Sequence, residues 1–378
     1  MKIVFSSDSF KGSLSSAKIN ELLTKAAKDV LKNCETVPVI LADGGEGTLD
    51  AVLSVKKGRR IPVTVHDPLM NTITAYYGSF DDGKALIEMA QASGLTLVPE
   101  KKRDPLLTGS IGTGELIRTA IEAGHKDIVV AIGGSATNDG GTGMLTALGI
   151  KFLDKNGKSL RGTGSDLARI ADIDPDGMMP ELKDTHITVM CDVTNPLCGP
   201  MGASFVFGPQ KGADEEKVKL LEAGMENYRD ILIHRFGTDP DSIPGAGAAG
   251  GMGAALKIFL GAELRSGIET LLDLCDYDSL IGGADLIITG EGRLDSQSCA
   301  GKAVQGVGLR AKKAGIPCIA ICGCTGEGYE KIREYGISEV TVLAEDDISR
   351  EYAMLHAEQL YYEKALSVMK QIEKTRFF

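Results

Sequence analysis

Six short segments of the chain stand out: five combine glycine or proline with polar and charged side chains and directly follow a predicted strand, and the sixth consists of glycine and alanine. The segments are residues 7–13, 42–48, 133–141, 191–197, 245–250 and 289–297. Ligands of open α/β sheets bind beyond the carboxyl ends of the strands. These segments are therefore where we expect catalytic and binding residues.

Charged side chains at three of these strand ends predict sites for a small anion, for a metal or for proton transfer. Asp8 and Lys11 stand where the first strand gives way to a helix, whose unpaired N–H groups attract an anion. Asp43 lies in a run that holds three glycines, and its carboxylate can bind a metal or accept a proton. Arg293 can form a forked pair with a carboxylate or a phosphate, and Asp295 near it can act as a base or as a metal ligand.

These segments also have a purely structural interpretation. Ser13 or Ser15 can cap the first helix, the acidic side chains near Asp43 can simply be solvated, and Arg293 can pair with Asp295. Capping accounts for one serine but not for an aspartate and a lysine beside it, so we favour a catalytic role. The residue that acts as the base stays open among the carboxylates.

A further polar turn follows the predicted strand 186–191. Asp192 and Asn195 can bind a metal or a substrate, or they can form an Asp/Asn-Pro turn without any function. The two interpretations weigh equally. With this turn included, the candidate catalytic residues are Asp8, Lys11, Asp43, Asp192, Arg293 and Asp295.

The segment 133–141 has the order strand, glycine-rich loop and helix, which is the topology of a phosphate cradle. Its side chains can donate hydrogen bonds to phosphate oxygens, and Asp139 can hold Mg²⁺ through water. A tight loop without a ligand is the alternative, and the chain has no Walker A motif. The candidate cofactor-binding residues are Gly133, Gly134, Ser135, Thr137, Asn138, Asp139 and Gly140, and the candidate metal ligands are Asp139 and Asp192.

Residues 245–250 match the dinucleotide-binding pattern GxGxxG, but the preceding residues 238–244 are polar and form no strand. A helix start packed closely on its neighbours, or a loop that meets substrate, fits this segment better. Lys211 stands in a turn between Gly208 and Gly212, and such a lysine is more often solvated than functional.

The elements that must position these loops fall into two patterns. Strand and helix alternate over residues 2–55 and again after residue 260, whereas residues 61–65, 73–80 and 84–89 read as a meander with an Asp82-Gly83 hairpin. We expect strands at 2–6, 37–41, 127–132, 186–191, 285–289, 317–322 and 339–343, and helices at 19–31, 48–55, 114–123, 140–148, 214–236, 302–313 and 350–374. The simplest architecture is one α/β domain built from both chain ends, residues 1–62 and 260–378, with a second α/β domain, residues 63–259, inserted between them.

Composition limits the class of protein. The 378 residues carry a formal net charge of −11, which argues against a nucleic-acid partner or an anionic membrane surface. No apolar run approaches the roughly 20 residues of a membrane helix. The eight cysteines are scattered, which favours reduced thiols and a cytoplasmic location. Glycine is enriched, at 47 residues, without a matching excess of proline, as in a folded protein with many tight turns.

The glycine-rich motifs together resemble the bacterial glycerate kinase family, the type that includes the D-glycerate 2-kinases. The resemblance rests on residues 8–12, 42–48, 133–141, 191–197 and 289–295, in the order expected for the family. It implies a flavodoxin-like parallel-sheet domain and an inserted α/β domain with a mixed sheet. The site loops are then expected to line a cleft between the two domains.

The resemblance further implies transfer of the ATP γ-phosphoryl group to D-glycerate, with Mg²⁺ as cofactor and 2-phospho-D-glycerate as product. A kinase that forms the 3-phosphate is the alternative within the family, and a homodimer stays open. Two rivals come from other classes. A nicotinamide-dependent hydroxy-acid oxidoreductase rests on the literal GxGxxG match, and a ligand-sensing module would need a cleft but not four or five carboxylates at strand ends.

Overall fold

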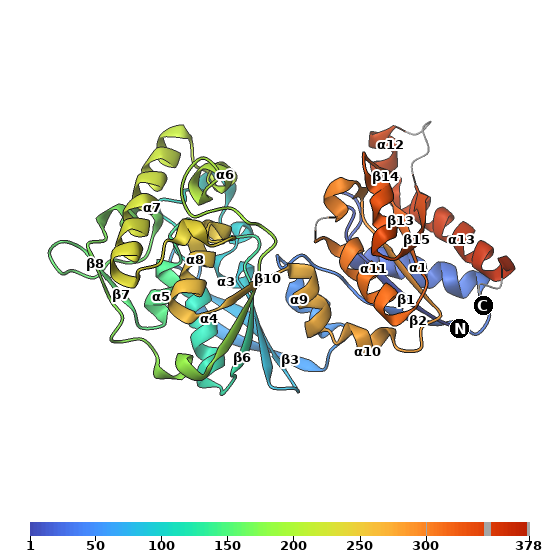
Figure 1. Cartoon of the computed structure of the whole chain (residues 1–378), viewed down its shortest axis with the longest axis horizontal. Helices are drawn as coiled ribbons and strands as arrows, with labels where there is room; N and C mark the ends of the chain where they lie inside the picture. The colour runs from blue at the N-terminus through green and yellow to red at the C-terminus, as the bar shows by residue number, and fades with distance from the viewer. Residues whose placement is uncertain (300, 344–348, 376–378) are drawn as a thin grey trace. The chain divides into compact units, whose positions relative to one another are not determined.

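The computed structural model describes residues 1–299, 301–343 and 349–375, which form two compact units (Figure 1). Unit 1 contains Met1–Asp43, Asp50–Lys56 and the chain from Ile268 onward. Unit 2 contains Gly44–Leu49 and Lys57–Gly267. Both chain ends belong to unit 1. The domain borders that we expect from the sequence, at 62/63 and 259/260, stay predictions.

The sheet of unit 1 has five parallel strands in the order β2, β1, β11, β13, β15. Their bounds are β1 Lys2–Ser7, β2 Glu35–Pro38, β11 Leu286–Gly290, β13 Cys318–Cys322 and β15 Ile337–Val342. Every residue of β11 and β13 is buried, as expected for parallel strands that are covered on both faces. Numbered along unit 1, the order is 2-1-3-4-5, which is the flavodoxin-like order and confirms the predicted fold class.

Three helices cover this sheet. On one face, α1 (Ser16–Val30) and α13 (Ala357–Thr375) share a core with β1, β11 and β13, and α11 (Ala303–Ala314) contacts the sheet as well. Helix α1 forms where apolar residues recur at a spacing of three to four, and Ser15 accepts a hydrogen bond from the Lys18 N–H to cap its start. Of the two serines considered as its cap, the structure therefore selects the second.

The sheet of unit 2 has six strands in the order β10, β9, β6, β5, β4, β3. Their bounds are β3 Gly58–His66, β4 Thr72–Phe80, β5 Lys84–Glu88, β6 Asp127–Ala131, β9 His186–Met190 and β10 Glu263–Arg265. Strands β3, β4 and β5 form the antiparallel meander that the sequence predicts, and β5, β6, β9 and β10 are parallel. The sheet is therefore mixed.

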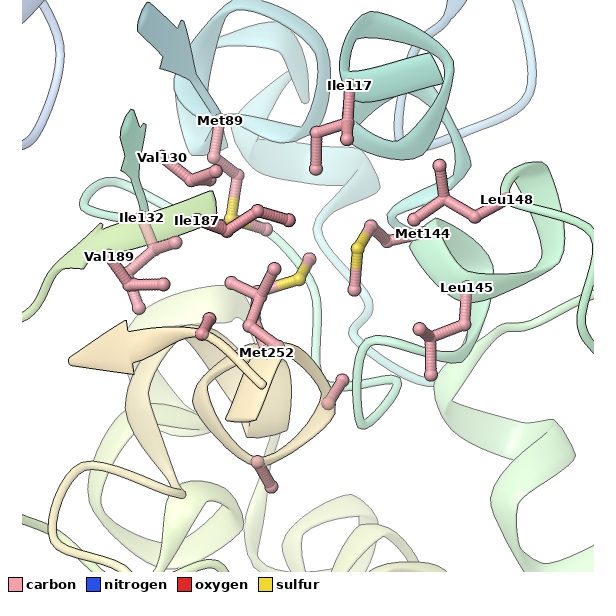
Figure 2. Close-up of a cluster of buried hydrophobic side chains, with 14 of the residues drawn as sticks. Met89, Ile117, Val130, Ile132, Met144, Leu145, Leu148, Ile187, Val189 and Met252 are labelled. Atoms are coloured by element: carbon pink, nitrogen blue, oxygen red, sulfur yellow. The ribbon is translucent and has the colours of Figure 1, made fainter. Parts of the chain in front are cut away.

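The core of unit 2 lies between its sheet and the helices α4 (Ile111–Glu122), α5 (Thr142–Ala147) and α8 (Ala248–Leu260). Figure 2 shows side chains converging from these elements, with Val130, Ile187 and Val189 on β6 and β9 and Met144, Leu145 and Met252 on the helices. This core anchors both ends of the glycine-rich loop 133–141, which joins β6 to α5.

The remaining helices and strands are shorter or peripheral. They are α2 Thr48–Leu53, α3 Ala90–Ser93, β7 Lys151–Leu153, β8 Asp172–Asp174, α6 Ala203–Phe207, α7 Glu215–Phe236, α9 Gly267–Leu274, α10 Tyr277–Ile281, β12 Arg293–Leu294, β14 Cys324–Thr325 and α12 Arg350–Leu355. Among the residues that the structure describes, no helix combines the length and the apolar character needed to cross a membrane.

The structure corrects three elements of the sequence-based expectation. The final helix is interrupted at His356, so that α12 and α13 replace a single helix over 350–374. Strand β2 ends at Pro38 rather than at residue 41. The glycine-alanine segment after α7 leads into a helix: residues 249–251 have positive φ and are not helical, and α8 continues beyond them to Leu260.

Glycines in unit 2 allow separate loops to touch backbone to backbone. A Cβ on Gly133 would lie 2.7 Å from the Gly45 Cα, and one on Gly250 would lie 2.1 Å from the Thr137 carbonyl oxygen. The Gly140 N–H donates to the Gly250 carbonyl at 2.9 Å. The GxGxxG segment thus packs against the loop 133–141, as the helix-start interpretation predicts, and its glycines serve internal packing.

Gly250→Ala is predicted to destabilise the protein far more than Gly237→Ala. Both glycines have positive φ, +70° and +66°, so both alanines bear the left-handed backbone cost of about 1 kcal/mol. Only at Gly250 does the new Cβ also collide with a carbonyl oxygen, because a Cβ on Gly237 meets nothing within 4 Å. We expect an additional loss of about 2 kcal/mol for Gly250→Ala in urea denaturation. Equal losses would contradict the packing argument.

Candidate active site

The order of strands in unit 1 places its topological switch point at the carboxyl ends of β1 and β11, where ligands of open α/β sheets bind in a crevice. The chain leaves β1 toward β2 on one side and leaves β11 toward β13 on the other, so the two connections separate there. Ser7 is paired with Gly290, and the Asp8 N–H donates to the Gly290 carbonyl at 2.8 Å. The next residue on each strand is a carboxylic acid, and Asp8 and Glu291 therefore face the same crevice.

Exposed charged groups surround this crevice. Lys11 Nζ lies 3.8 Å from Asp43 Oδ2, and the two side chains are 83% and 64% exposed. Arg293 Nε lies 3.2 Å from Asp295 Oδ2, so the ion pair considered as a structural alternative is present. The Arg293 side chain nevertheless remains 66% exposed and accessible to an anion. A solvent-screened pair of this kind is worth little to stability, so both cations remain available for substrate.

Two carboxyl groups lie deeper than these exposed residues. Asp8 is half-buried, and its Oδ1 accepts a hydrogen bond from the Ser9 N–H at 2.6 Å. Burial raises the pKa of Asp8, and the Asp43 charge raises it further, while Ser9 and Lys11 oppose the shift. Glu291 is 8% exposed, and burial raises its pKa to about 7, with Asp8 and Asp295 adding to the shift.

In unit 2, Asp139 organises the predicted phosphate loop. Its side chain is fully buried and accepts hydrogen bonds from the Ser110 N–H at 2.9 Å and the Ser110 hydroxyl at 2.7 Å. The N–H groups of Gly141 and Gly143 donate to it at 3.1 and 3.2 Å. Burial raises the pKa of Asp139, and these four hydrogen bonds oppose the shift. Both carboxylate oxygens are thus engaged by the chain itself.

Lys211 holds the same loop from the other side. The ammonium group is 2% exposed and donates to Ser135 Oγ at 2.8 Å and to the Thr137 carbonyl at 2.6 Å. Burial lowers the pKa of Lys211 to about 7. The sequence favoured a solvated lysine in a turn, and the structure shows a buried one. Asn138 is likewise buried, and its amide donates to Ser204 Oγ at 3.3 Å.

The structure divides the predicted cofactor-binding residues into accessible and buried groups. Gly134 is exposed, Gly133 is intermediate, and Ser135 is 8% exposed. Thr137, Asn138, Asp139 and Gly140 are buried in the loop. Only the first part of the loop can therefore meet a ligand directly in this conformation, and the second part supports it.

Asp192 lies at the carboxyl end of β9, exposed at the surface of unit 2. Its Oδ1 accepts a hydrogen bond from the Gly267 N–H at 2.7 Å, and the Asn195 amide donates to the Met201 carbonyl at 2.7 Å. The Asp192 contact therefore reaches a residue 75 positions further along the chain, and the Asn195 contact closes a loop of six residues. The predicted roles of Asp192 in catalysis and metal binding stay predictions.

Among the described residues, no group of three or more histidine, cysteine, aspartate or glutamate side chains is arranged to hold a metal ion. Mg²⁺ is commonly held by one or two carboxylates together with phosphate oxygens of a ligand. Asp8 and Asp43 supply oxygen ligands of the kind that Mg²⁺ prefers.

Sequence reasoning overlooked Glu291 and undervalued Lys211. Glu291 stands in the segment 289–297, but only its neighbours Arg293 and Asp295 were assigned a role from the sequence. Its position directly after five consecutive buried strand residues was the available signal. For Lys211 no local signal exists, because its burial comes from loops that are distant in the sequence.

The chain matches known proteins along nearly its whole length. The model of the glycerate kinase family matches residues 3–373. A glycerate kinase of Bacillus cereus is 47% identical over 95% of this chain and 94% of its own length. A glycerate 2-kinase of Escherichia coli K12 is 47% identical over 90% of both chains. A crystal structure described as a glycerate kinase 2 of Salmonella typhimurium LT2 superimposes with a TM-score of 0.85 at 41% identity and covers 100% of both chains.

Asp139→Asn is predicted to lower stability in the absence of nucleotide and metal. The amide places an NH₂ group where the carboxylate accepts hydrogen bonds, which we expect to cost about 3 kcal/mol in urea denaturation. Asp154→Asn is the matched control, because Asp154 accepts backbone hydrogen bonds from Asn156 and Lys158 in a solvated turn. If Asp139 served only as a metal ligand, its variant would match the control when no metal is present.

Glu291→Gln is predicted to change how stability depends on pH. The pKa of Glu291 is about 7 in the folded chain against an ordinary value of 4.5, so between these values only the folded state keeps the proton. The natural chain therefore loses stability as the pH rises from 4.5 to 7, by up to about 3 kcal/mol, and the amide variant lacks this loss.

The measurement is the urea midpoint of both proteins at pH 5 and at pH 8, with Glu330→Gln, an exposed site in unit 1, as control. The difference between the natural chain and Glu291→Gln should shift in favour of the variant at the higher pH. A difference that is the same at both pH values would show that Glu291 titrates normally.

Proposed function

The chain belongs to the glycerate kinase family, and on that premise we propose that it transfers the γ-phosphoryl group of ATP to the 2-hydroxyl of D-glycerate. Membership of this family identifies the protein as a phosphotransferase that acts on an alcohol. The 2-phosphate is favoured as product because the Escherichia coli relative, 47% identical, is named a glycerate 2-kinase. ATP as donor and Mg²⁺ as cofactor belong to the same proposal.

The observation that carries this proposal is the crevice of unit 1, where exposed cations lie beside half-buried and buried carboxyl groups. Glycerate is a small anion with hydroxyl groups, and it needs a cation for its carboxylate and a base for its hydroxyl. Lys11 and Arg293 provide cations, and both are exposed. Asp8, Asp43 and Asp295 provide carboxylates within the same group of loops. The net negative charge of the chain therefore does not prevent binding of an anion, because the local charges decide.

Phosphoryl transfer requires the protein mainly to align the reacting groups and to neutralise the charge of the phosphates. Lys11 and Arg293 are suited to neutralise the charge on the substrate carboxylate and on the transferring phosphoryl group. A carboxylate among Asp8, Asp43 and Asp295 takes the proton of the attacking hydroxyl. Asp8 and Asp43 would hold Mg²⁺, which would reduce the negative charge on the phosphates.

The loop 133–141 is suited to the phosphates of ATP at its accessible start. Gly134 has a positive φ of +75° and is exposed, so the backbone there can approach a ligand closely. Asp139 and Lys211 fix the shape of the loop from inside unit 2. We propose Gly133, Gly134 and Ser135 as the contacts to phosphate, and we assign Thr137, Asn138, Asp139 and Gly140 to support. The reaction cleft between domains that the resemblance implies stays a prediction.

The rival oxidoreductase has little support. Its only motif, GxGxxG at residues 245–250, packs against the loop 133–141, and Gly250 leaves no room even for a Cβ. A cofactor pyrophosphate would need that same backbone to be accessible. The alternative product is the 3-phosphate, whose formation differs only in which hydroxyl of glycerate faces the base. An experiment can distinguish the two products.

The function is tested by incubating the chain with ATP, Mg²⁺ and D-glycerate and following phosphoenolpyruvate formation by added enolase. Enolase accepts the 2-phosphate directly, so we expect signal without phosphoglycerate mutase. Signal that requires the mutase would show the 3-phosphate as product. ADP release without any phosphorylated glycerate would exclude glycerate as the substrate.

The same assay tests whether Lys11 and Arg293 contribute to the reaction with glycerate. Lys11→Ala and Arg293→Ala are each expected to lower kcat/KM for glycerate by about 100-fold, the effect of removing one charged donor from an anion site. Lys32→Ala, an exposed lysine of the same unit, serves as control and should match the natural chain. A variant with full activity would remove its residue from the site.

A further inference from the structure

Lys211 is a buried cation that the chain does not pair with an acid. It is 2% exposed, and its ammonium group donates to Ser135 Oγ at 2.8 Å and to the Thr137 carbonyl at 2.6 Å. Among the described residues no carboxylate forms an ion pair with Lys211, and the charge of Asp139 acts on it without a direct contact. Burying an ammonium group without a paired charge is costly, so we expect this lysine to have a task beyond packing.

The turn that carries Lys211 is held against the rest of unit 2. Lys211 ends the turn Pro209–Lys211 between α6 and α7, and Gly212 follows it with a φ of +98°. A Cβ on Gly212 would lie 2.4 Å from the Arg103 carbonyl oxygen, so only glycine allows this close packing. The ammonium group therefore reaches the loop 133–141 from a fixed backbone position.

The contact with Lys211 decides what the Ser135 hydroxyl can do. An ammonium group has three N–H donors and no acceptor, so Ser135 Oγ must accept from it. The single hydrogen of the hydroxyl is then left to donate to another group, and no described residue accepts it. Ser135 is 8% exposed and follows Gly134, which is exposed, so this hydrogen lies at the accessible start of the loop.

The backbone around Ser135 is arranged in the same sense. The Leu95 N–H donates to the Gly134 carbonyl at 2.8 Å, and the Ala136 N–H donates to the Ser93 carbonyl at 2.9 Å. In this pattern the residue between the two bonds turns its own N–H away from the neighbouring segment. The Ser135 N–H accordingly has no acceptor among the described residues. A hydroxyl and an N–H that both lack an acceptor at one residue favour an anionic ligand.

We propose that Lys211 is a positioning residue for the phosphates of ATP, which holds the Ser135 hydroxyl as a donor to a phosphate oxygen and places a positive charge directly behind it. This inference rests on the proposed function and deepens it. Ser135 makes the contact with the phosphate, and Lys211 acts through Ser135.

The bound phosphate in turn completes the environment of Lys211. Its negative charge favours the ammonium form, against the burial that lowers the pKa of Lys211 to about 7. Hydrogen bonds in a chain polarise one another, so a hydroxyl that accepts from an ammonium group is a stronger donor than one that does not. Removing the charge of Lys211 should therefore weaken the binding of phosphate, while the binding of the rest of the nucleotide is kept.

The test measures the dissociation constant of ATP, with Mg²⁺ and without glycerate, by isothermal titration calorimetry. We expect binding about 10-fold weaker in Ser135→Ala and about 30-fold weaker in Lys211→Met, the range for losing a hydrogen bond to a charged group. Ser165→Ala and Lys219→Met, both exposed sites in unit 2, are the controls and should match the natural chain. Unchanged ATP binding in Ser135→Ala or in Lys211→Met would overturn the inference.

Adenosine separates a positioning role from a general distortion of the unit. It has no phosphate, so its dissociation constant should stay within about 2-fold of the natural value in Ser135→Ala and in Lys211→Met. Equal losses of affinity for ATP and for adenosine would show that Lys211 only supports the fold, and the inference would fail.

The double variant tests whether Lys211 acts through Ser135. If it does, the two losses do not multiply, and the combination of Ser135→Ala with Lys211→Met should bind ATP less than about 3-fold more weakly than Lys211→Met alone. A loss of about 300-fold, the product of the two single losses, would show that the residues act independently and would contradict the proposal.

Lys211→Met also removes the donor of the Thr137 carbonyl, so its fold is checked by circular dichroism. If this variant does not fold, Lys211→Gln takes its place, because the amide can still donate to that carbonyl but carries no charge. The same selective loss of ATP affinity is expected, and an ATP affinity equal to that of the natural chain would overturn the role of Lys211.

Nucleotide binding and phosphorylation of glycerate are separate readouts. If glycerate is not phosphorylated but ATP affinity depends on Ser135 and Lys211 as described, the proposed function fails and the inference stands. If glycerate is phosphorylated and the variants bind ATP as the natural chain does, the function stands and the inference fails. A natural chain that binds no ATP would overturn both.

Discussion

The parallel register between β1 and β11 is the constraint on which the candidate site depends. These strands come from opposite ends of the chain, and their pairing of Ser7 with Gly290 fixes where each strand stops. Because parallel strands end at the same edge, the residues that follow them must share one crevice. That pairing brings Asp8 next to Glu291, although 282 positions separate the two in the sequence. A shift of one residue would place other side chains at the edge.

In unit 2 the loop 133–141 has no regular secondary structure and is held in place by close backbone packing. The glycines of unit 2 let backbones touch where any side chain would collide, as Gly250 does against the Thr137 carbonyl. Asp139 and Lys211 then satisfy the polar groups that this close packing buries. Buried charges are costly unless they are hydrogen-bonded, and both of these side chains make several hydrogen bonds. These contacts within the chain therefore hold the shape of the loop 133–141.

The sequence predicted much of the fold and part of the candidate site. Continuous apolar runs marked the buried strands β11 and β13, and the Asp82-Gly83 hairpin marked the meander, because these signals are local. The break at His356 and the helix α8 were missed, since apolar periodicity continues across the first and glycines obscure the second. The sequence showed which aspartates of the candidate site follow a strand, but it did not show which side chains are buried. The loop residues Thr137, Asn138 and Asp139 looked like ligand contacts and lie inside the unit.

The sequence by itself therefore determined the family, the α/β class and the segments that carry charge, because motifs and apolar patterns are properties of neighbouring residues. The tertiary structure alone decided which acids are buried and which cations stay in water. Burial and like-charge proximity set the pKa of a carboxyl group, and both arise from residues far apart in the chain. Lys11 and Lys211 are each followed by glycine in the sequence, yet one is 83% exposed and the other 2%. The surroundings that folding creates therefore give Lys11 and Lys211 different roles.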